Sequence, residues 1–192
     1  MPATKTRDAR QLPAPSSSEM IGTTAHWVLG ALREVHGLPE SHSELLCRAA
    51  AGLRFIRSTA SYSRLDHEVF RIALSGLDEP DAFVVEAAAC CAADAFEFID
   101  AEGWRRADSR GERRVLWFAA VLGLAEAVCD RSSGPPASVC VTCGDKVLRL
   151  EFSADAPLDA RLARASSRVV ALEALTGRRV LLCSSEFRPG AA

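Results

Sequence analysis

Hydrophobic residues recur at helical spacing through the first two-thirds of the chain. They return every three or four positions, the spacing that places side chains on one face of an α-helix. The pattern predicts five helices, over about Ser18–His36, Glu40–Ile56, Leu65–Ser75, Ala82–Ile99 and Glu112–Asp130. The fourth is apolar nearly all round, which predicts that it is buried centrally, with Asp81 as its N-terminal cap. The charged residues 101–111 predict a loop before the fifth helix.

The pattern changes after the fifth helix. Ser138–Cys143 and Val147–Phe152 alternate on either side of a Gly-Asp turn, which is typical of a β-hairpin. Leu158–Leu175 is an amphipathic helix, and Arg179–Cys183 is a last strand. The sequence therefore predicts a mainly helical α+β fold: helices in residues 18–132, then a ββαβ unit in residues 137–184 packed on them. Residues 1–17 are predicted to be a disordered lead-in, and residues 185–192 a tail.

Composition narrows the class of protein. The chain has 192 residues, 48% of them hydrophobic, which is ample for a packed core. Its net charge of −2 gives no general reason to bind nucleic acid or an acidic membrane. No run is long enough to span a bilayer, and the N-terminus lacks an apolar signal core. We therefore expect a cytoplasmic protein with neither a membrane nor a nucleic-acid partner.

The seven cysteines predict a reducing compartment rather than a disulfide framework. Cys140 and Cys143 form a lone CxxC with no second pair of ligands at zinc-site spacing. Residues three apart on a strand also point to opposite faces. No metal site is predicted there.

Four segments, in order, resemble one family. They read LREVHGL (32–38), LLCRAAAGLRFI (45–56), HEVFRI (67–72) and LGLAEAVCDRS (122–132). They resemble the words LAELHGL, LLEAAALLHDIG, HSYYLI and LRLADALDRS of the C-terminal region of the exopolyphosphatase / guanosine pentaphosphate phosphatase (Ppx/GppA) family. Two further segments, VLRL (147–150) and GRRV (177–180), resemble the closing strand, helix and strand of that region, so the resemblance spans residues 20–184. It implies that the five helices form an HD-type domain, and that the chain forms a homodimer or pairs with a protein partner.

The resemblance also implies a metal site whose ligands this chain lacks. An HD site holds divalent metal with histidines and aspartates and activates water on a phosphoester. The central His-Asp pair falls at Arg54-Phe55, a later histidine falls near Ala92 or Ala93, and Glu126 alone keeps a carboxylate. An arginine offers no lone pair and repels a metal. The glycine-rich phosphate loops of the family's catalytic half do not occur in the sequence either, so we expect no metal, no cofactor and no inherited catalysis.

Arginines are the remaining polar signal, because 21 of the 23 basic residues are arginine. Guanidinium groups bind phosphate bidentately without a metal. The candidate residues for binding polyphosphate or a guanosine polyphosphate are Arg54, Arg57, Arg64, His67, Arg113, Arg114 and Arg131, with Glu126 and Asp130 as remnant acidic positions.

Three alternatives remain open at this point. The arginines can simply be solvated surface residues paired with neighbouring acids. The chain can be a residual phosphohydrolase of polyphosphate or pppGpp that uses Glu126, Asp130 and His67. It can also be a structural subunit that pairs with an actin-like half encoded elsewhere.

Overall fold

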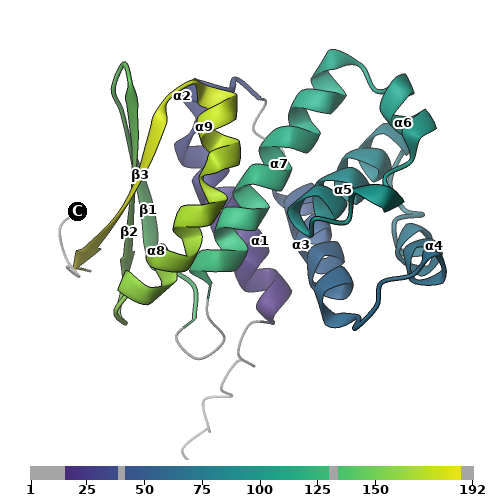
Figure 1. Ribbon diagram of the computed structural model, residues 1–192, viewed down its shortest axis with the longest axis horizontal. Coiled ribbons are helices and arrows are strands. Elements are labelled where there is room, and N and C mark those ends of the chain that lie inside the picture. The colour runs from purple at the N-terminus through teal and green to yellow at the C-terminus, as the bar shows by residue number, and fades with distance from the viewer. Residues whose placement is uncertain (1–15, 39–41, 130–133, 187–192) are drawn as a thin grey trace, which may run out of the picture.

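The structure, a computed structural model, describes residues 16–38, 42–129 and 134–186. It confirms the predicted fold class, a mainly helical α+β protein whose helical region precedes a small three-stranded mixed sheet (Figure 1). The helical region contains α1 (Ser17–Ala31), α2 (Arg33–His36), α3 (Ser43–Ser58), α4 (Arg64–Ala73), α5 (Glu79–Ala92), α6 (Ala101–Arg106) and α7 (Ser109–Val128). The predicted lead-in and tail lie almost wholly outside the described residues.

Two short helices add to the predicted five. The first predicted helix breaks at Leu32 and resumes as α2, which ends where Gly37 adopts a left-handed conformation with φ 61°. The prediction of a loop over residues 101–111 is wrong. Asp100 caps α6 by accepting a hydrogen bond from the Glu102 N–H at 3.0 Å, and α7 begins at Ser109. Charge in this segment marks exposed helix faces rather than absence of helix.

The boundaries of the central helix α5 also differ from the prediction. Asp78, not Asp81, is its N-cap: the Asp78 side chain accepts from the Asp81 N–H at 2.9 Å. The helix ends at Ala92, earlier than predicted, because Asp94 takes a left-handed conformation with φ 61°. The Ala95 N–H then donates to the Cys90 carbonyl at 2.9 Å, which closes the helix end in a Schellman-type turn. Aspartate is less usual than glycine or asparagine in a left-handed conformation, so the sequence gives no clear signal that α5 ends here.

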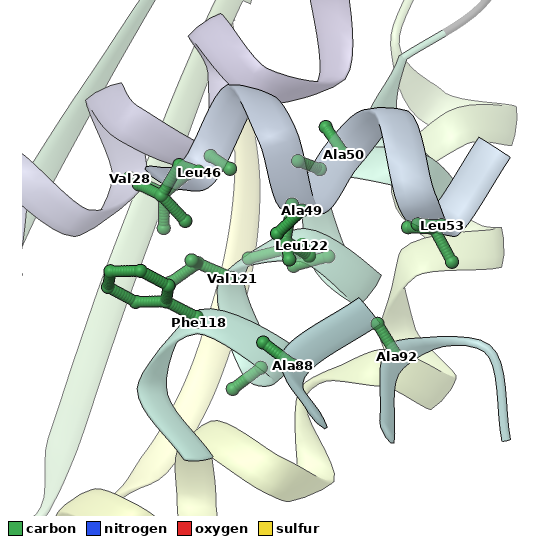
Figure 2. Close-up of a cluster of buried hydrophobic side chains, with 14 of the residues drawn as sticks. Val28, Leu46, Ala49, Ala50, Leu53, Ala88, Ala92, Phe118, Val121 and Leu122 are labelled. Atoms are coloured by element: carbon green, nitrogen blue, oxygen red, sulfur yellow. The ribbon is translucent and has the colours of Figure 1, made fainter. Parts of the chain in front are cut away.

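The core lies where α1, α3, α5 and α7 pack together. Small residues on α3 and α5 let these helices approach closely, and larger side chains from α7 fill the remaining space (Figure 2). Helix α4 is anchored to this bundle by Phe70, whose ring packs directly on Gly52 of α3. A Cβ at Gly52 would overlap that ring, so the absence of a side chain there positions α4.

The three-stranded sheet has the order β1 (Ser138–Cys143), β2 (Val147–Ala154), β3 (Arg179–Glu186). Strands β1 and β2 form the predicted antiparallel hairpin, and β3 runs parallel to β2. A parallel neighbour needs a crossover, which α8 (Asp159–Ala165) and α9 (Val170–Thr176) supply. The predicted single helix over 158–175 is interrupted by a 3-10 turn at Ser166–Arg168.

Buried side chains join this sheet to the helices. Leu148, Leu150 and Phe152 alternate along β2 and are fully buried. Helices α8 and α9 lie between the sheet and α7 (Figure 1). The core is therefore continuous from the helical region into the sheet. Within the described residues, no helix has the length and apolar character that crossing a membrane requires.

Candidate functional site

The predicted polyanion-binding residues lie on separate parts of the molecule. Arg57 is near the end of α3 beside Glu126, which is near the end of α7. Arg113 is in the first turns of α7, thirteen residues before Glu126, which at 1.5 Å per residue places them roughly 20 Å apart along the helix axis. Arg64 begins α4, and half-buried Arg54 is on α3. Arg131 and Asp130 lie outside the described residues.

Arg57 contacts two of the positions at which the resemblance places metal ligands, Ala92 and Glu126. Its Nε lies 3.6 Å from Glu126 Oε2, and its Nη2 donates to the Ala92 carbonyl at 3.1 Å. The same Nη2 lies 3.5 Å from Asp94 Oδ2, which also faces Arg168 Nη1 at 3.3 Å. Two guanidinium groups thus meet two carboxylates. In the part of the chain that the structure describes, no three His, Cys, Asp or Glu side chains come together as a metal site would require.

His67 belongs to a second, buried cluster. Its Nε2 lies 3.1 Å from Glu86 Oε1, and its Nδ1 lies 3.2 Å from the Tyr62 hydroxyl. Arg71 Nε lies 3.3 Å from the other Glu86 oxygen, Oε2. Burial lowers the pKa of His67, and the charge of Arg71 lowers it further, which favours a neutral imidazole. Nδ1 and the Tyr62 hydroxyl share a hydrogen bond whose direction follows from which ring nitrogen carries the proton.

Glu86 is the functional candidate that the sequence reasoning missed. Burial raises its pKa to about 7; the charge of Arg71 opposes this rise, and those of Asp100 and Glu68 add to it. Groups with strongly shifted pKa values in a cavity are candidates for binding or proton transfer. A signal was present: Glu86 is the sole charged residue between Ala82 and Ala93 in the most apolar helix. A carboxylate in such an apolar helix is costly to bury unless it is paired with another residue or with a ligand.

We expect Glu86 to make stability depend on pH. Its folded pKa of about 7 exceeds the ordinary value of 4.5, so the folded state binds more protons between these values. Stability is therefore lost as pH rises through this window, by about 3 kcal/mol at one pKa unit per 1.36 kcal/mol. Glu86→Gln removes this loss. Urea unfolding at pH 5 and pH 8 should show the wild type losing stability relative to Glu86→Gln.

The exposed Glu68 on α4 provides the matched control for this prediction. Glu68→Gln should leave most of the pH-dependent loss in place, because the buried carboxylate is still present. The titration of His67 is common to wild type and variant, so to first order it cancels in the comparison. A wild-type-to-Glu86→Gln difference that stays the same at pH 5 and pH 8 would contradict the assigned pKa.

A cavity of about 760 Å³ opens beside Glu86. It lies between the end of α4, the first half of α5, α6 and the first turn of α7. Arg114, one of the predicted phosphate-binding residues, lines it but pairs with Asp81 at 2.6 Å. The Arg114 side chain is 14% exposed, so this guanidinium is already neutralised in a shielded place. Arg114 is thus less available to a phosphate than its neighbour Arg113.

A second pocket, of about 700 Å³, adjoins the first near the start of α7. Its lining residues are Arg33, Gly37, Leu38, Ser109, Arg110 and Arg113. We call this group the arginine pocket. Among the described residues that line it, three are arginines and none is acidic. Within the described residues, neither Arg110 nor Arg113 forms an ion pair.

The positive charge around this pocket affects the pKa of the nearby His36 imidazole. His36 is buried, its Nε2 lies 2.8 Å from the Leu29 carbonyl, and its Nδ1 accepts from the Leu38 N–H at 2.8 Å. Burial lowers its pKa, and the charges of Arg113 and Arg33 lower it further. A neutral His36 leaves the arginines as the source of positive charge in the pocket.

Neither protein-family models nor curated proteins match this chain. Its function is therefore inferred from its own residues and from the order of the sequence words given above. Of the three groups of polar residues, the Arg57 cluster is internally neutralised, the Glu86 cluster is buried, and the arginine pocket is open and positively charged.

Proposed function

We propose that the chain is a non-catalytic relative of the C-terminal domain of the exopolyphosphatase / guanosine pentaphosphatase family that acts in the cytoplasm by binding a phosphate-rich anion. Polyphosphate and guanosine polyphosphates are the ligands proposed. The observation that carries this proposal is the arginine pocket: the part of its lining that the structure describes has three arginines and no carboxylate, and Arg110 and Arg113 share one opening. The arginine pocket is a different site from the patch around Arg54 and Arg57 that the sequence predicts.

The chemistry of the arginine pocket suits phosphate. Guanidinium groups match phosphate oxygens with two parallel N–H donors, and they stay charged at every physiological pH. Arg110 and Arg113 are three residues apart on α7, so they share a face of the helix. Ser109, the first residue of this 20-residue helix, also lines the pocket, and the N-cap Asp108 holds the helix start by accepting from the Gly111 N–H at 2.7 Å. A chain of phosphates can contact both guanidinium groups.

Binding without hydrolysis is the favoured mode of action. Arg57 pairs with Glu126, the one expected metal-ligand position that keeps a carboxylate, and also with Asp94. These pairs lie about 20 Å along α7 from Arg113. A phosphate held in the arginine pocket would therefore be remote from the remnant carboxylate.

We expect Arg110→Gln/Arg113→Gln to weaken binding of polyphosphate and guanosine pentaphosphate by at least about 100-fold, because two charged hydrogen bonds at about 1.5 kcal/mol or more each are lost and about 1.4 kcal/mol is a tenfold change. The dependence of affinity on salt concentration should also become shallower, since fewer phosphate charges are neutralised. Tryptophan fluorescence can follow the titration. Trp117 of α7 is buried with its ring 5.6 Å from the His36 ring, next to the pocket.

Two control variants separate this site from its rivals. Arg105→Gln removes a 71% exposed side chain of α6 that pairs with Glu102, and it should leave affinity unchanged. Arg54→Gln/Arg57→Gln tests the patch predicted from sequence. If that pair abolishes binding while the α7 pair does not, the arginine pocket is the wrong site. Release of phosphate from either ligand by purified protein would instead support the residual phosphohydrolase.

A further inference from the structure

The cavity beside Glu86 is distinct in chemistry from the arginine pocket. Six carboxylate and four guanidinium side chains line it, which leaves two negative charges in excess. Leu74, Leu77, Phe83 and Val84 supply apolar surface along the same walls. Its volume of about 760 Å³ is in the range that small-molecule sites occupy. The cavity combines room, apolar contact and negative charge.

Most of its carboxylates already have partners. Asp78, Asp100 and Asp108 accept hydrogen bonds from backbone N–H groups at the starts of α5, α6 and α7. Glu79 pairs with Arg106 at 2.9 Å, and Asp81 pairs with Arg114. These five side chains are explained by the fold itself. They position the helices around the cavity. Asp100 has a second oxygen, Oδ2, whose contact with Arg106 Nη2 is long, at 3.9 Å.

Glu86 differs from these five carboxylates. It lines the cavity, yet it is 5% exposed, and its Oε1 accepts no hydrogen bond from any described residue. The Nε2 of His67 lies 3.1 Å away, but without hydrogen-bond geometry. Arg71 faces the other oxygen, and its guanidinium side chain is 50% exposed. A buried carboxylate oxygen with no donor is costly, and a ligand N–H would relieve that cost.

Titratable groups from several elements surround this carboxylate. They are Tyr62 before α4, His67, Glu68 and Arg71 on α4, Cys90 on α5, and Asp100 before α6. The lowered pKa of His67 favours its neutral imidazole. Burial raises the pKa of the Cys90 thiol to about 12, which keeps this thiol uncharged. Arg71 is thus the nearby cation, set against the negative charges of Glu86, Glu68 and Asp100. A second cation would balance this excess.

We propose that this cavity binds a small organic cation: a primary ammonium group on a short hydrocarbon, held by the carboxylate of Glu86 and by Asp100, with the hydrocarbon against Phe83 and Leu77. The ammonium supplies the N–H donors that this carboxylate lacks. It also relieves the repulsion between two carboxylates. An ammonium carries three donors and no acceptor, which matches a site rich in acceptors. The apolar wall excludes water from the pair and gains contact area.

Phenethylamine is a suitable probe, with 3-phenylpropionate and 2-phenylethanol as anionic and neutral counterparts of similar shape. Calorimetry or protein-observed NMR should show saturable binding of the amine with a Kd of about 1 mM or tighter. The amine stays protonated from pH 6 to pH 8, whereas Glu86, with a pKa of about 7, gains its charge over this range. Affinity should rise about 5-fold to 10-fold between pH 6 and pH 8.

Two variants and one control decide the outcome. Glu86→Gln should weaken amine binding by about tenfold or more and remove its pH dependence. Asp100→Asn should weaken amine binding several-fold, because one opposite charge near an ion typically changes affinity by about tenfold or less in a solvated site. Glu97→Gln, an exposed residue outside the cavity lining, should change neither. The proposal is overturned if wild-type protein shows no saturable amine binding, if 3-phenylpropionate binds as tightly, or if both cavity variants bind like wild type. None of these outcomes depends on phosphate binding to the arginine pocket.

Discussion

Phe118→Ala is expected to lower the free energy of unfolding by about 3–5 kcal/mol, the usual cost of truncating a buried phenylalanine. Phe118 is fully buried in the cluster that also contains Val28 of α1, Leu46 of α3 and Ala88 of α5 (Figure 2). The His42 ring packs edge-on against it, with ring centroids 5.2 Å apart. Alanine-rich helices have few long side chains with which to fill a void, so the cavity would remain.

Urea unfolding followed by circular dichroism measures this loss. Leu116→Ala is the matched control, because Leu116 lies on the same helix but is 44% exposed. We expect it to cost less than about 1 kcal/mol, since little apolar area returns to water. Equal losses in the two variants would show that helix propensity rather than core packing sets the stability of α7.

Arg161→Ala is expected to lower the free energy of unfolding by about 2–5 kcal/mol. Arg161 of α8 is 3% exposed, its Nε donates to the Val128 carbonyl at the end of α7, and its Nη2 donates to the Gly134 carbonyl at 2.7 Å. Alanine would leave both carbonyls without this donor, and an unpaired buried polar group costs about 1–3 kcal/mol. The guanidinium also joins the crossover helix to the end of the helical bundle, so its loss should loosen the sheet unit.

Hydrogen exchange distinguishes that local effect from a general one. In Arg161→Ala, amide protons of β1 and β2 should exchange faster, while those of α3 and α5 change less. Arg164→Ala is the control, because Arg164 lies on the same short helix and is exposed. Arg161→Lys should recover part of the stability, since one ammonium cannot reach both carbonyls in the same fork geometry. Wild-type stability in Arg161→Ala would refute the structural role assigned to this side chain.

The two proposed ligand sites are neighbours with opposite charge preferences. Arg110 lines both of them, at the start of α7. Within residues 16–38, 42–129 and 134–186, the lining of the arginine pocket includes no carboxylate, whereas that of the cavity beside Glu86 includes six. Phosphate binding and amine binding can therefore be measured separately in one protein. The Arg110→Gln/Arg113→Gln and Glu86→Gln variants should each affect its own ligand far more than the other.

Helix and strand types were readable from the sequence because their hydrophobic periods are local. The β-hairpin at Ser138–Cys143 and Val147–Phe152 and the long helices followed from periods of two and 3.6 residues. Helix ends were read less well. Asp94 ends α5 in a left-handed conformation that its residue type does not announce, and Asp78 rather than Asp81 caps it.

The sequence by itself determined the class of fold, the order of its elements and the wealth of arginine, because each is a property of neighbours along the chain. The tertiary structure decided which arginines meet. It placed Arg57 against Glu126, Arg114 against Asp81, and Arg113 beside Arg110 in an open pocket. It also turned Glu86, a single charge in an apolar helix, into the buried carboxylate of a cavity. Charge and pKa depend on what lies across space, and helix packing alone sets those distances.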